Sequence, residues 1–89
     1  MNKTELILSE LEYLIDEEKR IILPRFFKTG KGEYGEGDQF LGVTVPRIRS
    51  VASVHLDTST HDIEILLSSP WHEVRMCGLM IMVENCKKI

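Results

Sequence analysis

The chain has 89 residues, enough for one small domain, and its 43% hydrophobic and 28% charged residues are typical of a folded protein rather than a disordered one. No apolar run approaches the ~20 residues of a membrane helix, and the N-terminus carries acids where a signal peptide needs an apolar core. A cytoplasmic location without membrane contact is therefore expected. The net charge is −3, yet in residues 21–49 bases outnumber acids, unlike the segments on either side.

Two helices are predicted before the first glycine. From Thr4 to about Arg20, apolar residues recur at the spacing of one face of an amphipathic helix, and acidic residues can occupy the opposite face. The apolar positions are Ile7, Leu11, Leu14 and Ile15, and the acidic ones are Glu10, Glu12, Asp16 and Glu17. A second, short helix is expected from about Glu18 to Lys28, where Pro24 either opens a new turn or kinks a running one.

A glycine-rich loop is predicted over residues 29–42, which hold all of the glycines except Gly78. Within it, residues 30–35 match the G-x-G-x-x-G spacing of loops that bind nucleotide phosphates. Such a site needs a strand before the loop and a helix opening directly after the last glycine. Here a predicted helix precedes the loop, and Glu36-Gly-Asp38 follows it. The glycines therefore indicate a flexible loop, and no nucleotide site is expected.

Three further helices are predicted after the loop. Thr44 is able to cap the first of them, with Pro46 in the first turn, where a missing amide costs little. Hydroxyl side chains at residues 58–60 can cap the second, and Pro70 opens the third. The three helices are expected at about residues 45–56, 60–67 and 70–86.

The last of these helices is apolar nearly all the way round, which implies burial on more than one face. A second layer is expected to cover it, supplied either by further repeats of a longer protein or by a second copy of this chain. No segment alternates apolar and polar residues as a strand does. The sequence therefore predicts an all-α fold of about five helices in antiparallel pairs, forming one segment, 1–89, of a helical-repeat domain.

The histidines and cysteines indicate no metal or redox site. His55, His61 and His72 have no ligand spacing with one another or with the cysteines. Cys77 and Cys86 fit neither a zinc knuckle nor a redox Cys-x-x-Cys and are expected to be reduced packing residues. No metal and no cofactor is expected.

The segment GEYGEGDQFLGVTVPRIRSVA resembles the DNA alkylation repair proteins, the AlkD-like DNA glycosylases built from HEAT-like repeats. The matching residues begin with FFKTG at 26–30 and continue through Phe40, Gly42, Pro46 and Arg49. A second match, LLSSPWHEVRMCGLMIM, places Pro70, Glu73, Arg75 and Leu79 where the family begins and fills its next helix. The resemblance covers the chain from Leu11 to Lys88.

The resemblance implies a curved HEAT-like or ARM-type α-α superhelix whose concave, basic face holds duplex DNA. It also implies excision of cationic alkylated bases, with a carboxylate stabilising the developing sugar cation and aromatic side chains against the lesion. Those residues, an aspartate with neighbouring tryptophans, belong to repeats beyond the last residue of this sequence, so no catalytic residue is assigned. Trp71, beside Pro70, is expected to be a packing anchor instead. The chain alone is expected to be inactive.

Five residues are candidates for contact with DNA phosphate, which positions a protein without reading sequence. Lys28 and Lys31 either contact phosphate or are simply solvated, and Tyr34 either lies against DNA or pins the loop to the helices. Arg49 is a candidate too, although a structural role, pairing with an acid or capping a helix end, is favoured. Glu73 is expected to stabilise the helix dipole and Arg75 to pair locally. The five candidates are Lys28, Lys31, Tyr34, Arg47 and Arg49.

Two functions remain open. In the first, the chain is the N-terminal part of a DNA repair glycosylase, shortened by truncation, and contributes scaffold and DNA backbone contacts. In the second, it is a stand-alone helical-repeat module without chemistry, which self-associates or binds a protein partner through its apolar last helix.

Overall fold

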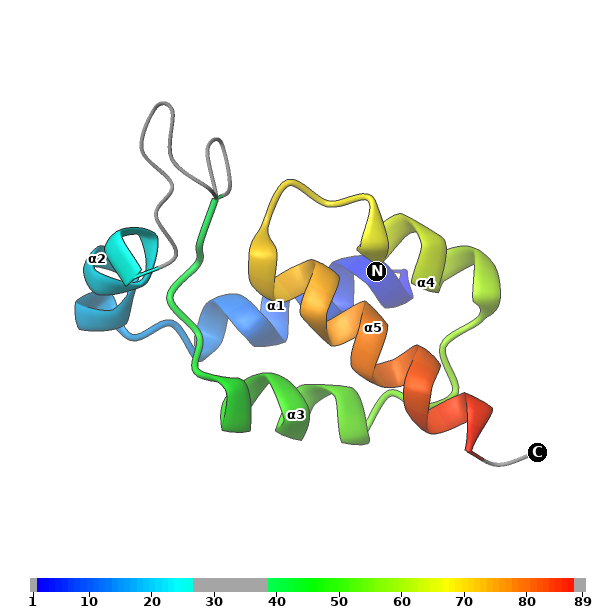
Figure 1. The fold of residues 1–89 in the computed structure, drawn as a ribbon. Helices are drawn as coiled ribbons and strands as arrows, with labels where there is room; N and C mark the ends of the chain where they lie inside the picture. The colour runs from blue at the N-terminus through cyan, green and yellow to red at the C-terminus, as the bar shows by residue number, and fades with distance from the viewer. Residues whose placement is uncertain (1, 27–38, 88–89) are drawn as a thin grey trace.

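The computed structural model describes residues 2–26 and 39–87, and these residues form five α-helices and no strand (Figure 1). The helices are α1 (Lys3–Tyr13), α2 (Glu17–Phe26), α3 (Val45–Ser53), α4 (Thr60–Leu67) and α5 (His72–Cys86). The all-α prediction is confirmed, and α4 has the predicted bounds. Most of the predicted glycine-rich loop, up to residue 38, lies outside the described residues. No described helix is both long and apolar enough to cross a bilayer.

The first predicted helix was wrong at its C-terminal end, because α1 stops at Tyr13 and a second helix starts at Glu17. Asp16 lies between the two and caps α2, rather than lying on the polar face of one long helix. Its Oδ1 accepts hydrogen bonds from the backbone N–H groups of Glu18 and Lys19 at 3.0 and 3.4 Å. An acidic cap of this kind satisfies amides that have no partner within the helix.

Two other helix ends differ from the prediction. Helix α3 ends at Ser53 rather than Leu56, and α5 begins at His72 rather than Pro70. Pro70 lies in a bend just before α5, after Ser69, whose Oγ accepts a hydrogen bond from the Trp71 amide at 3.1 Å. The expected cap at Thr44 also differs: the residue has the N-cap position of α3, but its side chain makes no capping bond.

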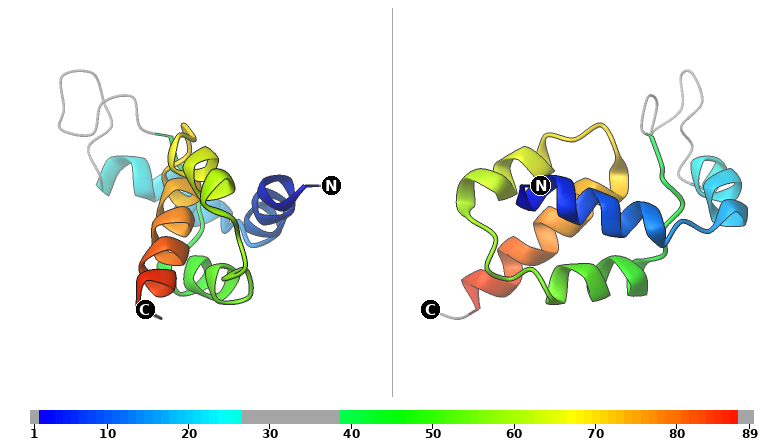
Figure 2. Two further views of the ribbon diagram at one scale, coloured as in Figure 1. Left: turned by 90° about the vertical axis from the view of Figure 1, so that its right-hand side faces the viewer. Right: turned by 180° about the vertical axis from the view of Figure 1, so that it is seen from behind.

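Helices α1, α3, α4 and α5 pack around one core, with α1 opposed in direction to α3 and α4 roughly opposed to α5 (Figures 1 and 2). Helix α2 stands apart, and within the described part of the chain it makes no contact with the other four helices. Gly78 allows α5 to approach α4 closely, because a Cβ at this position would lie 2.9 Å from the Leu66 Cβ. The core consists of Ile7, Leu11, Leu41, Val43, Ile48, Val51, Ala52, Ile63, Leu66, Val74, Cys77 and Ile81.

Helix α5 packs against α1, α3 and α4. Val74, Cys77 and Ile81 on it are buried, as its apolar sequence predicts. Leu79 and Val83 nevertheless stay 47% and 42% exposed. The described helices therefore cover α5 on more than one face and leave part of its apolar surface open.

The two cysteines have different environments. Cys77 is a buried packing residue as expected, but Cys86 is exposed, which corrects the expectation for that residue. Desolvation raises the pKa of the Cys77 thiol to about 12, and the negative charge of Glu10 contributes in the same direction. Only the thiolate is strongly nucleophilic, so Cys77 is chemically inert near neutral pH.

A thiol titration checks this difference. At pH 8, we expect Ellman's reagent to modify one thiol per native chain and two after denaturation, because the raised pKa leaves about one Cys77 in ten thousand ionised. In Cys86→Ser, the native reaction should fall close to zero, whereas Cys77→Ala should keep it. Rapid native modification of Cys86→Ser would contradict the buried position of Cys77.

Candidate functional site

A buried carboxylate at the start of α5 holds the segment that leads into α3. Glu73 is 1% exposed, and its carboxylate accepts three backbone hydrogen bonds. The amide of Leu41 donates to Oε1 at 2.8 Å, and the amides of Gly42 and Val43 donate to Oε2 at 2.9 and 3.1 Å. The carboxylate thus fixes a non-helical segment about thirty residues away in sequence, a larger role than the predicted effect on the helix dipole.

Gly42 joins this anchored segment to α2. Its φ angle is 96°, a left-handed conformation that favours glycine. A Cβ at this position would lie 2.7 Å from the Arg20 backbone nitrogen, so only glycine allows α2 to come this close. The carbonyl of Gly42 accepts a hydrogen bond from the Asp16 amide at 2.8 Å, next to the N-terminus of α2. Glu73 and Gly42 therefore place α2 relative to α5.

Residues 39 and 40, just before the three amides that Glu73 binds, pack against the start of α5. The His72 amide donates to the Gln39 carbonyl at 2.8 Å, and the buried Phe40 ring lies 4.6 Å from the His72 ring, centroid to centroid. Trp71 is partly buried against the core, in agreement with its expected role as a packing anchor. The guanidinium of Arg75 donates from Nη1 to the Ser69 carbonyl at 2.9 Å, a local contact.

The two arginines of α3 have different surroundings. Arg47 is exposed and donates from Nη1 to the Leu14 carbonyl at 3.0 Å, at the C-terminal end of α1. Arg49 is also exposed, and within the described part of the chain it has no hydrogen bond or ion pair. The other candidates for DNA contact, Lys28, Lys31 and Tyr34, lie outside the described residues.

Arg49 borders an apolar groove between α3 and α5, which the sequence did not predict as a feature. The groove has a volume of about 680 Å³. Its charged residues are Arg49, Glu84 and Lys87, and the Lys87 ammonium lies 3.2 Å from the Glu84 carboxylate. The remaining lining residues are Val45, Ala52, Ser53, Leu56, Met76, Leu79, Met80 and Val83.

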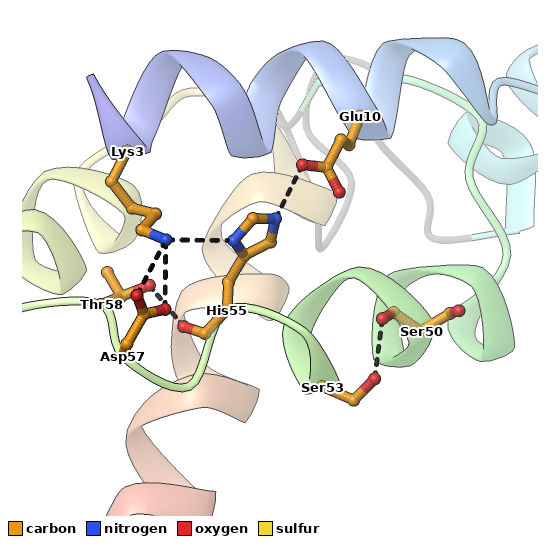
Figure 3. A network of polar contacts seen from close by, with 7 residues as sticks. All are labelled: Lys3, Glu10, Ser50, Ser53, His55, Asp57 and Thr58. Atoms are coloured by element: carbon orange, nitrogen blue, oxygen red, sulfur yellow. Dashed lines mark hydrogen bonds and ion pairs between the residues drawn. The ribbon is translucent and has the colours of Figure 1, made fainter. Parts of the chain in front are cut away.

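A second polar cluster, centred on His55, joins α1 to the connection between α3 and α4 (Figure 3). His55 is 6% exposed, and its Nε2 lies 2.7 Å from the Glu10 carboxylate. The Lys3 ammonium lies 3.4 Å from its Nδ1 and 3.1 Å from the Asp57 carboxylate. Because an ammonium can only donate, Nδ1 is the accepting ring nitrogen in this contact, and Nε2 is then the nitrogen that donates to Glu10.

This His55 cluster is a structural feature that the sequence analysis missed, because its members are far apart in the chain. The Lys3 ammonium holds the pKa of Asp57 below its usual value, first through the hydrogen bond and then through its charge.

The described residues contain no group of three or more His, Cys, Asp or Glu side chains able to hold a metal ion. Within the same residues, every buried side-chain nitrogen and oxygen has a hydrogen-bond partner.

Comparison with known proteins gives one finding. A family model described as DNA alkylation repair enzyme matches residues 7–89. No curated protein and no solved structure gives a match. The matched range contains α2 to α5 and most of α1. It therefore also contains Glu73 with the three amides that it binds, and the groove between α3 and α5.

Proposed function

Because the chain belongs to the DNA alkylation repair enzyme family, we propose that it forms the N-terminal, HEAT-like portion of an AlkD-like DNA glycosylase. In this role it supplies scaffold and contacts to the DNA backbone and does not excise bases by itself. The observation that carries the proposal is the family match over residues 7–89. The opposed directions of α1 and α3, and of α4 and α5, agree with a stack of helix pairs.

The proposed lack of catalysis follows from the residues that the reaction needs. Excision of a cationic base requires a carboxylate beside the sugar and aromatic surface beside the lesion. The family's set combines an aspartate with neighbouring tryptophans, but this sequence has a single tryptophan, Trp71. That side chain packs against the core, and Glu73, the buried acid nearest to it in sequence, holds three backbone amides. These contacts support a scaffolding role for both side chains.

Arg47 is the described residue best suited to contact a phosphate. Its side chain is exposed, and one of its two terminal nitrogens donates to the Leu14 carbonyl, which holds the guanidinium in place. A guanidinium has five N–H donors, so the others remain available for phosphate oxygens. Lys28, Lys31 and Tyr34 precede it in the sequence and share its proposed role, as does Arg49.

A salt titration with duplex DNA tests this proposal. We expect binding at low salt that weakens as salt rises, because phosphate contacts release counterions. Arg47→Gln should weaken binding and reduce the slope of log K against log salt by about one. Lys87→Gln removes the same charge from an exposed residue outside the proposed contact set and serves as the matched control. Absence of binding at low salt, or equal losses in both variants, would contradict the proposed contact.

The second candidate function is a non-catalytic module that self-associates or binds a protein partner. The observation in its favour is the apolar groove between α3 and α5, with Leu79 and Val83 exposed along it. Size-exclusion chromatography with light scattering distinguishes self-association from a monomer. A stable dimer without any affinity for duplex DNA would favour this candidate over the first.

A further inference from the structure

We propose that protonation of His55 displaces the Lys3 ammonium from the imidazole and loosens the first turn of α1, so that pH controls how firmly the N-terminus of this helix is held. The proposal holds whether or not the chain contacts DNA. Two observations carry it: the buried position of the ring between an ammonium and a carboxylate, and the fixed backbone that bears the ring (Figure 3).

The neutral ring of His55 connects two groups of opposite charge on α1. Its Nδ1 accepts from the Lys3 ammonium at 3.4 Å, and its Nε2 donates to the Glu10 carboxylate at 2.7 Å. Since Nε2 already carries a hydrogen, an added proton can bind only at Nδ1. Nδ1 then becomes a donor facing another donor, and the ring becomes a cation beside a cation, at a residue that is only 6% exposed. Protonation therefore breaks the contact with Lys3 and turns the contact with Glu10 into an ion pair.

The backbone of His55 is fixed, so the Lys3 side chain is the part that moves. The His55 amide donates to the Ala52 carbonyl at 3.1 Å, and the His55 carbonyl accepts from the amide and the hydroxyl of Thr58 at 3.1 and 2.5 Å. None of these bonds involves a group that titrates near neutral pH. Lys3, in contrast, ends in an ammonium on a flexible four-carbon stem and is the first residue of α1.

Two further titratable groups of the cluster keep their charge state over the range in which an imidazole ordinarily titrates, about pH 5 to 8. Asp57 stays ionised because the Lys3 ammonium lowers its pKa. Cys77 of α5, which interacts with the charge of Glu10, stays protonated because desolvation raises its pKa to about 12.

Asp57 is the described partner that Lys3 keeps after the release. Their charged groups lie 3.1 Å apart, and the Asp57 side chain is 74% exposed. Exposed ion pairs of this kind contribute little to stability. The first turn of α1 is therefore held by two partners of Lys3 while His55 is neutral, and this attachment weakens as the pH falls and the ring takes up a proton.

Hydrogen exchange in the full chain measures the hold on this turn. The amides of Glu5 and Leu6 donate to the side chain and the backbone carbonyl of Asn2 at 2.9 and 3.0 Å, so they report opening of the first turn. Protection factors, which correct for the intrinsic pH dependence of exchange, are compared at about pH 8 and about pH 5, and ring nitrogen chemical shifts follow the protonation of His55. We expect the protection of both amides to fall roughly three- to ten-fold toward the lower pH, in step with protonation of Nδ1.

Two variants remove the proposed response by different routes. His55→Gln keeps a donor for Glu10 and an acceptor for Lys3 but cannot take up a proton, so protection should stay high at both pH values. Lys3→Met removes the ammonium at a partly exposed residue and should give lower protection that no longer changes with pH. His61→Gln, at an exposed histidine of α4, is the matched control and should keep the wild-type response.

The proposal is overturned if protection in the wild-type chain is the same at both pH values, or if the response persists in Lys3→Met or His55→Gln. Ring nitrogen shifts that show a protonated Nδ1 at the higher pH, or loss of the response in His61→Gln, would overturn it as well.

Discussion

Replacement of Glu73 by glutamine is expected to lower the free energy of unfolding by about 2–4 kcal/mol, a large effect for a conservative substitution. The carboxylate accepts hydrogen bonds on both oxygens, from Leu41 on one and from Gly42 and Val43 on the other. Glutamine replaces one of these oxygens by an NH₂ group, which cannot accept. In either orientation of the amide, at least one buried N–H then faces another donor.

Chemical denaturation followed by circular dichroism measures this loss. Glu84→Gln is the matched control, because Glu84 lies on the same helix, is exposed and, among the described residues, makes a surface ion pair with Lys87. Surface pairs of this kind contribute little, so its stability should stay within about 0.5 kcal/mol of the wild type. Equal stability of Glu73→Gln and Glu84→Gln would contradict the anchoring role of Glu73.

Replacement of Gly42 by alanine is expected to cost about 2–3 kcal/mol and to displace α2. Two separate effects add in this substitution. The φ angle of 96° is unfavourable for any residue with a Cβ. The new Cβ would also lie 2.7–2.8 Å from the N, Cα and Cβ atoms of Arg20, and a helix backbone cannot yield as the end of a flexible side chain can.

Hydrogen exchange separates a local from a global effect of this substitution. In Gly42→Ala, the Asp16 amide, which donates to the Gly42 carbonyl, should exchange faster, and so should the Arg20 amide, which donates to the Asp16 carbonyl. Gln39→Ala, at an exposed side chain of the same segment, should leave both rates unchanged. Unchanged protection of Asp16 and Arg20 in Gly42→Ala would show that the close approach to α2 is not required.

The helices were largely predictable from sequence because their signals are local. Apolar periodicity and the Ser59 cap, which accepts from the Asp62 amide at 3.2 Å, are enough to define α4. The break between α1 and α2 was missed because Leu14 and Ile15 continue the apolar spacing across it. The end of the first helix depends partly on a tertiary contact, because the Asp16 amide donates a hydrogen bond to the Gly42 carbonyl.

The candidate site was predictable only as a set of residues, not as an arrangement. Phe40, Gly42 and Glu73 were selected by resemblance, and no local pattern indicates that the Glu73 carboxylate reaches the amides of residues 41–43. His55 and Glu10 are 45 residues apart, so their contact depends on the packing of α1 against the helices that follow. The groove and the charged residues along its edge cannot be predicted from the sequence, because both depend on how α3 and α5 pack against each other.

The most direct test of the proposed function measures binding and excision on one sample of the purified chain. The substrate is a duplex that contains an N-alkylated, cationic purine, and the two readouts are the binding constant over a range of salt concentrations and the amount of free base released. We expect binding that weakens steadily with salt, and no base release above the spontaneous rate of the duplex alone. Enzymatic release of the base, or no binding even at the lowest salt concentration, would contradict a DNA-contacting scaffold that lacks catalysis.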